Sequence, residues 1–373
     1  MLRRRVPLAV TALALVAALA ACARTSAPAQ QAGTTRPAGV GARPAATATA
    51  SPEAGEVTRP ARQRPATLHV TAVGDYGSTS ASSGVLRGIA AARPDLHLAL
   101  GDLSYGSNGG EAAWCRFVTD HVGTRLPFEL LSGNHESNGE NGRIDAFTAC
   151  LPNRLAGLTG RYGREWYVDE PAGHPLVRFV MISPALPFAD GTWDYAKGTS
   201  HYAWTAAAIR GARAAGIPWV VVGMHEPCIS VGRYGCTVGT DVVDLLLAER
   251  VDVVLTGHEH LYQRSKALRL GPGCPGITPG RYVPACVGAS GNALEAGVGT
   301  VFVTVGTGRI PLREVSATDP EAGYFAATSG SNRVPTYGFA DLEVTPATLR
   351  LGFTGTSGSG FADRVVLTRT PSP

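Results

Sequence analysis

Short apolar runs alternate with segments of helical periodicity from residue 67 onward. Thr67–Val73 alternates apolar and polar positions and is rich in β-branched residues, which predicts a strand. Apolar runs predict further strands at Leu96–Leu100, Phe128–Leu131, Val177–Ile182, Trp219–Val222, Val251–Leu255 and Val301–Val305. Helical spacing predicts helices at Val85–Ala92, Glu111–Val122, His201–Ala215 and Asp241–Glu249. The tail predicts hairpin strands at Gly338–Val344, Leu349–Thr354 and Arg364–Leu367. Residues 66–373 are therefore expected to form a layered α/β domain with a mixed sheet.

Residues 1–21 have the pattern of an export signal. Arg3–Arg5 form a positive start, and Val6–Leu19 is an apolar stretch too short for a comfortable membrane span. The sequence Leu19-Ala20-Ala21-Cys22 then resembles the bacterial lipobox, which predicts lipid attachment at Cys22. The alternative is a plain secretory signal with a chance cysteine. We expect an exported lipoprotein, anchored by its lipid on the extracytoplasmic side of the cell membrane, or secreted.

Amino-acid composition distinguishes a linker, residues 22–65, from the domain that follows it. Residues 22–65 are dominated by Ala, Pro, Thr, Gly, Gln and Arg and contain no aromatic residue, which predicts a disordered linker. The whole chain of 373 residues has a net charge of +4, but residues 1–65 hold nine arginines and two glutamates. Residues 66–373 carry 24 basic and 27 acidic side chains and are mildly acidic. We therefore expect no nucleic-acid partner.

Six cysteines follow Cys22, namely Cys115, Cys150, Cys228, Cys236, Cys274 and Cys286. An even number in an exported protein favours disulfide bonds, of which about fifteen connectivities are possible. Nearest-neighbour pairing would join Cys115 to Cys150, Cys228 to Cys236, and Cys274 to Cys286. The competing interpretation is a zinc site, which the lack of any Cys-x-x-Cys spacing disfavours.

Five apolar runs end at a glycine followed by side chains that can bind metal. The motifs are Gly74-Asp75-Tyr76-Gly77, Gly101-Asp102-Leu103-Ser104-Tyr105, Gly133-Asn134-His135-Glu136, Gly223-Met224-His225 and Gly257-His258-Glu259-His260. Glycine allows a sharp turn, and strand ends at a sheet edge are where α/β folds bind ligands. Each motif alone is weak evidence, although on a strand His258 and His260 would point to the same face. Together the carboxylates, phenol, amide and imidazoles suit two first-row metal ions.

These motifs resemble those of the calcineurin-like metallophosphoesterases and, more narrowly, of the purple acid phosphatases. Gly77 stands where the common form of the superfamily has a histidine ligand, and Tyr105 stands where the purple acid phosphatases supply a tyrosine instead. Similarity continues in Ser200–Trp204, in the sequence GHEHLYQR of Gly257–Arg264, and in Tyr337-Gly338-Phe339. The resemblance runs from about residue 67 to the C-terminus. It implies an α/β (α+β) metallophosphoesterase fold, a four-layer αββα sandwich with mixed β-sheets.

The resemblance also implies roles for the matching residues. The first metal, Fe(III) in the family, would be bound by Asp75, Tyr105 and His260. The second metal, a divalent Fe, Zn or Mn, would be bound by Asn134, His225 and His258, and Asp102 would bridge the two. His135 follows the ligand Asn134 and would point elsewhere on a strand, to protonate the leaving oxygen or stabilise charge. Glu136 would orient His135, or would be an ordinary capping or salt-bridge residue.

The function expected from these residues is hydrolysis of phosphate monoesters by attack of a metal-bound hydroxide, as in an acid phosphatase. Its partner would be a small phosphorylated substrate. One alternative is a phosphodiesterase or nucleotidase that uses the same metal site. A different class is a lipoprotein that only binds phosphate or metal, but such a protein has no physical reason to keep His135.

Overall fold

The computed structural model describes residues 67–106 and 109–369. The expected signal segment, the lipidation residue Cys22 and the linker up to residue 65 lie outside the described residues. Among the helices that are described, none combines the length and the apolar character that crossing a membrane requires.

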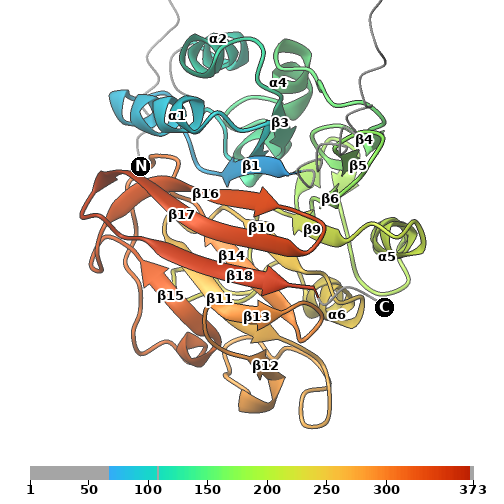
Figure 1. Cartoon of the computed structure of the whole chain (residues 1–373). Coiled ribbons are helices and arrows are strands. Elements are labelled where there is room, and N and C mark those ends of the chain that lie inside the picture. Colours follow the sequence, from blue (N-terminus) through green and yellow to red (C-terminus); the bar gives the residue numbers. More distant parts are fainter. Residues whose placement is uncertain (1–66, 107–108, 370–373) are drawn as a thin grey trace, which may run out of the picture. The chain divides into compact units, whose positions relative to one another are not determined.

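The first of two large sheets has seven strands in the order β13-β18-β17-β16-β1-β2-β3 (Figure 1). These strands are β1 (Leu68–Val73), β2 (Leu96–Leu100), β3 (Phe128–Leu131), β13 (Ala293–Glu295), β16 (Thr336–Val344), β17 (Thr348–Gly358) and β18 (Asp363–Thr368). β1, β2 and β3 run parallel, whereas β16 pairs antiparallel with both β1 and β17. The sheet is therefore mixed, as the sequence predicts.

The second sheet has nine strands in the order β12-β11-β14-β10-β9-β6-β5-β4, with β15 paired to β11. Its bounds are β4 (Thr159–Arg161), β5 (Glu165–Glu170), β6 (Val177–Met181), β9 (Trp219–Gly223), β10 (Val253–Thr256), β11 (Tyr262–Leu268), β12 (Val287–Ala289), β14 (Thr300–Val305) and β15 (Phe325–Ser329). β6, β9, β10 and β14 form a parallel centre. A separate short hairpin joins β7 (Pro187–Phe188) to β8 (Gly191–Thr192).

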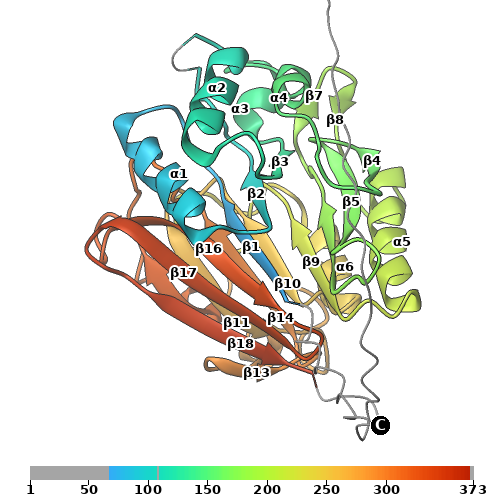
Figure 2. The same ribbon diagram turned by 45° about the horizontal axis from the view of Figure 1, so that its top comes forward.

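Helices cover the outer faces of the two stacked sheets (Figures 1 and 2). The α-helices are α1 (Ser80–Ala92), α2 (Glu111–Val122), α3 (Asn134–Ser137), α4 (Ile144–Cys150), α5 (Ser200–Ala214) and α6 (Thr240–Ala248), and short 3-10 turns cover Pro284–Cys286 and Ala322–Tyr324. α1, α2 and α4 lie on the first sheet, whereas α5 and α6 lie on the second. The expected four-layer αββα sandwich is confirmed.

Both sheets bury their inner faces in one continuous hydrophobic core. Every residue of β2 and of β9 is buried, as expected for parallel strands that are covered on both faces. Two buried tryptophans also link the sheets by hydrogen bonds. Trp166 Nε1 on β5 donates to the carbonyl oxygen of Leu130 on β3 (3.1 Å), and Trp219 Nε1 on β9 donates to that of Thr345 (2.7 Å). These two hydrogen bonds help to fix the position of one sheet relative to the other.

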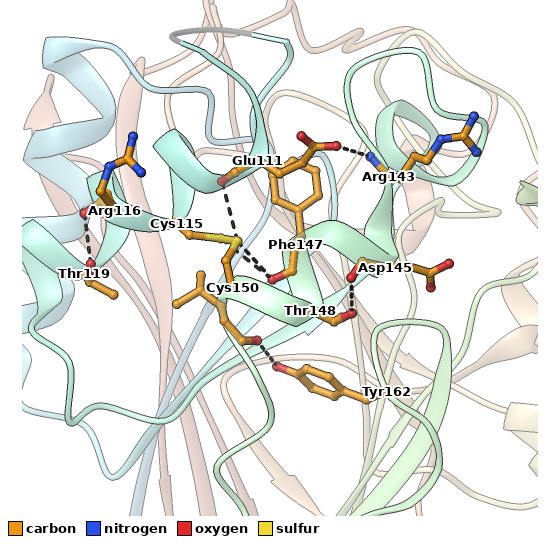
Figure 3. The surroundings of a disulfide bond; sticks show 11 residues. Glu111, Cys115, Arg116, Thr119, Arg143, Asp145, Phe147, Thr148, Cys150 and Tyr162 are labelled. Carbon is orange, nitrogen blue, oxygen red and sulfur yellow. Dashed lines mark hydrogen bonds between the residues drawn. A yellow bond between two sulfur atoms is a disulfide. The ribbon is translucent and has the colours of Figure 1, made fainter. Parts of the chain in front are cut away.

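The six cysteines form the nearest-neighbour disulfides that spacing suggested, which excludes a zinc site built from them. Cys115–Cys150 joins α2 to the end of α4 (Figure 3). Cys228–Cys236 joins residues eight positions apart in a loop after β9, and Cys274–Cys286 joins residues twelve positions apart in a loop after β11. Each cross-link restricts the unfolded chain and stabilises the folded one, typically by about 2–4 kcal/mol.

Some helices and strands are longer than the sequence pattern predicts, and others are not predicted at all, because polar side chains interrupt the apolar pattern. α1 begins at Ser80, five residues before the predicted start, because Thr79 caps it: Thr79 Oγ1 accepts from the Ser82 N–H (3.3 Å) and Ser82 Oγ accepts from the Thr79 N–H (3.2 Å). The pattern does not predict β5, whose half-exposed positions carry charges. Nor does it predict β11, which buries Gln263 and Arg264.

A buried carboxyl group on β3 makes stability depend on pH. The side chain of Glu129 is fully buried, and its Oε1 accepts from the Arg154 N–H (3.0 Å). Burial raises the pKa of Glu129 from its ordinary value of 4.5 to about 7; the Glu170 carboxylate acts in the same direction, and the groups of Arg154 and Tyr162 oppose it. The folded protein therefore holds this proton more tightly than the unfolded chain. Its free energy of unfolding falls as pH rises from about 4.5 to about 7.

We predict that Glu129→Gln removes this contribution, because the amide stays neutral at all these pH values. Relative to the parent protein, the variant should gain on the order of 3 kcal/mol in free energy of unfolding between pH 4.5 and 7.5. Urea unfolding at several pH values measures the difference. Glu295→Gln, on the exposed side of β13, is the matched control. A difference between Glu129→Gln and the parent that stays constant with pH would contradict the prediction.

Candidate metal centre

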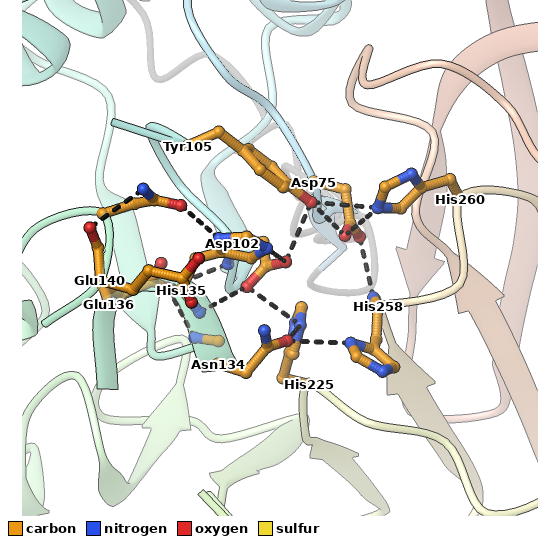
Figure 4. Close-up of polar contacts among 12 residues, drawn as sticks. Asp75, Asp102, Tyr105, Asn134, His135, Glu136, Glu140, His225, His258 and His260 are labelled. Atoms are coloured by element: carbon orange, nitrogen blue, oxygen red, sulfur yellow. Dashed lines mark hydrogen bonds and ion pairs between the residues drawn. The ribbon is translucent and has the colours of Figure 1, made fainter. Parts of the chain in front are cut away.

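The structure brings all seven predicted ligands into one cluster, formed by Asp75, Asp102, Tyr105, Asn134, His225, His258 and His260 (Figure 4). β1, β2 and β3 run parallel in the first sheet, and so do β9 and β10 in the second. The loops that carry the ligands follow the carboxyl ends of these five strands. Parallel strands end at a common edge of their sheet, so the two sheets deliver ligands from opposite sides.

One half of the cluster is centred on the phenol of Tyr105. Its Oη lies 2.9 Å from Asp75 Oδ1, 2.9 Å from Asp102 Oδ2 and 3.1 Å from His260 Nε2. His260 Nε2 is in turn 3.4 Å from Asp75 Oδ1. A single hydroxyl hydrogen can serve only one of these three acceptors at a time. A cation bound among the four atoms would be attracted by all of them, so this donor set fits a metal ion.

The other half of the cluster surrounds the amide of Asn134. Its Oδ1 lies 3.2 Å from His225 Nε2 and 3.0 Å from His258 Nδ1, and His225 Nε2 is also 3.2 Å from Asp102 Oδ1. His225 Nδ1 donates to the carbonyl oxygen of Leu100 (2.7 Å), so the lone pair of neutral His225 is on Nε2 and faces the cluster. Asp102, His225 and His258 bring ligand atoms within 4.8 Å of one another, which suits one metal ion.

The two oxygens of Asp102 face different halves of the cluster. Oδ2 contacts Tyr105 and Oδ1 contacts His225, so this one carboxylate lies between the two donor sets. Burial opposes its ionisation, but the charge and hydrogen bond of His225 hold the pKa of Asp102 below its ordinary value. For His225, burial favours the neutral ring, but the Asp102 charge prevails and raises the pKa to about 10. The surroundings of Asp102 and His225 therefore favour a positive charge beside the Asp102 carboxylate.

The pKa of His258 is shifted in the opposite direction to that of His225. Burial, and next the positive charge of His225, lower the pKa of His258 to about 3. A neutral imidazole is the form that binds metals. His258 therefore favours the neutral form, which has a lone pair for a metal ion.

Several ligands have backbone conformations that side chains rarely adopt. Asp75, Asp102, Tyr105 and His258 have φ values of 66°, 53°, 52° and 66°, in the left-handed region. Such conformations cost free energy and persist where the surroundings enforce them, often at functional sites. The space around Asp75 is also restricted, because a Cβ at Gly257 or at Gly306 would lie 2.8 Å from its Oδ2. The glycines at these strand ends make room for the carboxylate.

Two expectations about local backbone are wrong. His258-Glu259-His260 lies in an irregular bend between β10 and β11 rather than on a strand. The left-handed conformation of His258 still allows both rings to reach the cluster, with His258 using Nδ1 and His260 using Nε2. Likewise Asn134 and His135 begin the short helix α3 instead of ending a strand. Successive side chains diverge there by about 100° around the helix, so His135 still points away from Asn134.

Of the two alternatives for Glu136, the structure supports the capping residue and not the residue that orients His135. The buried carboxylate of Glu136 accepts hydrogen bonds from three backbone N–H groups: those of Asp102 (2.9 Å) and Gly133 (2.5 Å) at Oε1, and that of Leu103 (3.2 Å) at Oε2. It thereby fixes the turn that carries Asp102 against the start of α3. Glu136 is a structural support of the cluster and does not contact the His135 ring.

Asn141 takes the role that was expected of Glu136, and the sequence pattern did not indicate it. Asn141 Nδ2 donates to the carbonyl oxygen of Glu140 (3.0 Å), which turns Oδ1 toward His135 Nδ1, with which it makes a short hydrogen bond. His135 Nε2 then faces Asp102 Oδ2 at 3.6 Å, and the ring packs on that of Tyr105 with centroids 4.4 Å apart. About a quarter of the His135 side chain is exposed, so it can meet a substrate.

Other histidines, and two residues that follow the His258-Glu259-His260 motif, lie outside the cluster. His97 is fully buried, and its ring contacts Thr71 Oγ1 (2.8 Å) and Tyr76 Oη (2.6 Å). His201 stacks on Trp193 and Tyr195. Tyr262 and Arg264 both bond to Asp363 on β18 and so anchor β11 to the first sheet. These residues have structural roles.

A four-layer αββα sandwich with carboxylate, amide and imidazole donors at its strand ends defines a metallophosphoesterase. The sequence model of the calcineurin-like phosphoesterase family matches residues 68–262. The chain belongs to this family, and within it resembles the purple acid phosphatases.

Curated relatives support the same branch. Purple acid phosphatase 18 of Arabidopsis thaliana is 28% identical over 227 residues, which are 58% of this chain and 48% of that protein. Fe(3+)-Zn(2+) purple acid phosphatase 12 of the same plant is 27% identical over 213 residues, 52% of this chain and 42% of that protein. The chain spans about half the length of the curated relatives it matches.

Solved structures show the fold. Purple acid phosphatase PPD1 from yellow lupin (Lupinus luteus) seeds superposes with a TM-score of 0.60 at 17% identity, over 82% of this chain and 54% of that one. GAP50, described as the anchor in the inner membrane complex of Plasmodium, gives a TM-score of 0.54 at 14% identity, over 80% of this chain and 88% of that one. The sandwich is thus shared by proteins with different described roles, and the site must decide the function.

We predict that Glu136→Gln destabilises the fold, because the amide leaves at least one buried N–H without an acceptor. The free energy of unfolding should fall by about 1–3 kcal/mol. Urea unfolding measures the loss, and Glu140→Gln, an exposed neighbour, is the matched control. If both variants unfold at the same urea concentration, the proposed support by Glu136 is incorrect.

Proposed function

We propose that this protein is an exported phosphatase that hydrolyses phosphate monoesters at two metal ions. The observation that carries the proposal is the pair of donor sets that share Asp102. Each set gathers metal-binding atoms at hydrogen-bond distance around one point. Two cations, one on either side of the shared carboxylate, would be attracted by both sets.

The donor types suggest which metal each half would hold. Asp75, Tyr105 and His260 offer a carboxylate, a phenol and one imidazole, and hard anionic oxygens favour a trivalent ion such as Fe(III). Asn134, His225 and His258 offer an amide and two imidazoles, which suit a divalent Fe, Zn or Mn. The name of the Arabidopsis relative includes Fe(3+) and Zn(2+), which agrees with this choice. When bound, such ions neutralise phosphate charge and lower the pKa of a water ligand.

The chain itself would contribute proton transfer through His135. Asn141 accepts from Nδ1 and so leaves Nε2 facing the cluster. Protonated at Nε2, the ring would lie where it can donate to the oxygen that leaves phosphate, or stabilise charge on the phosphoryl oxygens. Asn141 is a positioning residue that acts through His135.

Export and lipid anchoring belong to the same proposal. Three disulfides are typical of an oxidising compartment outside the cytoplasm. The Leu19-Ala20-Ala21-Cys22 sequence would then place a lipid on Cys22 and attach the domain to the outer side of the cell membrane. Mass spectrometry of the mature N-terminus tests this: a diacylated Cys22 supports the anchor, and an unmodified start elsewhere excludes it.

The function is tested by phosphate release from protein loaded with iron and zinc. 4-Nitrophenyl phosphate and bis(4-nitrophenyl) phosphate separate the enzyme classes. A higher kcat/KM for the monoester supports the proposal, and a higher value for the diester would instead indicate a phosphodiesterase. With both metals bound and neither ester hydrolysed, the protein would be a binding protein.

We predict that Tyr105→Phe removes the colour of the iron-loaded protein. A phenolate bound to Fe(III) absorbs visible light by charge transfer, and phenylalanine offers no oxygen. The absorption band should disappear while circular dichroism stays unchanged, because the ring can keep its packing on His135. Tyr202→Phe, on α5, is the matched control. A parent protein that is colourless and fully active with zinc or manganese in both sites would contradict the iron assignment but not the phosphatase activity.

We predict that His135→Ala keeps both metals and lowers kcat by about 10²–10⁴-fold, as is usual for loss of a general acid. Asn134→Ala and His258→Ala should instead lower metal content and activity together. Elemental analysis beside steady-state kinetics distinguishes the two effects. Asn141→Ala should retain the metals and lower kcat less than His135→Ala does. Loss of a metal from His135→Ala would show that the division between ligand and acid is wrong.

A further inference from the structure

The loop closed by Cys228–Cys236 reaches over the second donor set. The ring of Tyr234 in this loop stacks on His258, with centroids 4.4 Å apart and planes 30° from parallel. The loop is also tied to the ligand segment, because Glu259, buried between the two histidines, makes a short hydrogen bond with the Tyr234 N–H. The loop therefore forms part of the rim of the metal site.

Arg313 forms the adjoining part of this rim. Its backbone N–H donates to the carbonyl oxygen of His260 (2.8 Å), and its Nη1 donates to that of His258 (3.2 Å). The same nitrogen lies 3.6 Å from Glu259 Oε2, and the guanidinium carbon is 4.7 Å from the centroid of the Tyr234 ring. Arg313 thus joins the ligand segment to the rim, with about a quarter of its side chain exposed.

A pocket of 630 Å³ opens beside these residues. Its lining includes Gly232, Arg233, Leu312, Arg313, Glu314 and Asn332. A smaller pocket of 150 Å³ shares Val315 and Ser316 with it and includes Arg333. The two pockets therefore adjoin, and the larger one includes Arg313 of the rim.

The charged residues that line these two pockets are predominantly positive, whereas the domain as a whole is mildly negative. Residues 66–373 have more acidic than basic side chains, yet three guanidinium groups line the two pockets against the exposed carboxylate of Glu314. Glu259 is fully buried behind Arg313. Over residues 67–106 and 109–369, no carboxylate lies within ion-pair distance of Arg233 or Arg333. The Arg233 guanidinium carbon is 5.6 Å from the centroid of the Tyr234 ring, so this cation lies beside the rim.

We propose that this pocket is a subsite for the leaving group of the substrate, and that it selects phosphate esters whose leaving group carries a second anionic group. The proposal rests on the proposed function, because the scissile phosphate would occupy the metal cluster. A leaving group directed past Tyr234 would enter the pocket, where Arg233 can pair with a carboxylate or a further phosphate. Arg313 would add positive potential while Glu259 holds it in place.

The subsite is tested with two substrates that differ by one charge. Phenyl phosphate and 4-carboxyphenyl phosphate have the same ring, and only the second has an additional carboxylate. The parent protein and Arg233→Gln are compared with metals loaded. Arg233→Gln should lower kcat/KM for 4-carboxyphenyl phosphate by about three- to fivefold and change that for phenyl phosphate less than about twofold, since one exposed charge pair is lost. The effect should shrink at 1 M salt.

Two variants control for effects unrelated to pairing. Arg233→Lys retains the charge and should restore most of the preference, whereas Arg87→Gln, an exposed arginine on α1, should leave both substrates unaffected. If Arg233→Gln alters both esters equally or neither of them, the subsite proposal is wrong and the phosphatase proposal stands.

A binding measurement keeps the two proposals separate. Phenylphosphonate and 4-carboxyphenylphosphonate are not hydrolysed, and calorimetry with metal-loaded protein gives their Kd values whether or not the protein is an enzyme. The carboxylated compound should bind more tightly to the parent, and Arg233→Gln should remove that difference. Equal Kd values for the two compounds on the parent protein, or no binding of either, would overturn the subsite.

Discussion

The rest of the structure depends on the crowding of oxygen and nitrogen lone pairs around Asp102. This buried carboxylate touches the phenol of Tyr105 on one side and the imidazole of His225 on the other. Such a cluster repels itself unless positive charge is present, which the raised pKa of His225 reflects. The surrounding fold provides the constraint that keeps the groups together: two sheets bonded through Trp166 and Trp219, and a backbone turn fixed by Glu136.

Much of the fold could be predicted because its central strands are apolar on both faces. The run at β9 is continuous and that at β2 is broken only by His97. Each ends at a glycine that is followed within two residues by a donor side chain, so both the strands and the ligands are visible in the sequence. β11 could not be predicted, because the partners of its buried Arg264 are distant in sequence: Asp363 follows it by 99 residues and Asn292 by 28. The alternating strand β5 is also hidden by its charged outward positions.

Within the site, the types of ligand were predictable but the hydrogen bonds that orient them were not. A ligand is recognised by its chemistry and its place after a strand, whereas the partner of His135 depends on the direction in which side chains leave α3. Glu136 is adjacent in sequence yet turns to backbone N–H groups, and Asn141, six residues from His135, reaches its ring. The stacking of Tyr234 on His258 likewise depends on how a disulfide-closed loop folds back, which no local pattern encodes. That loop connects the metal cluster to the surface through Glu259 and Arg313.

The central claim is that two metal ions flank Asp102. The most direct measurement is anomalous X-ray diffraction from crystals of the metal-loaded protein, with data collected on both sides of the iron and zinc absorption edges. The account predicts two anomalous peaks, one among Asp75, Tyr105 and His260 and the other among Asn134, His225 and His258, with the Asp102 carboxylate between them. A single peak, or two peaks that do not share Asp102, would contradict it.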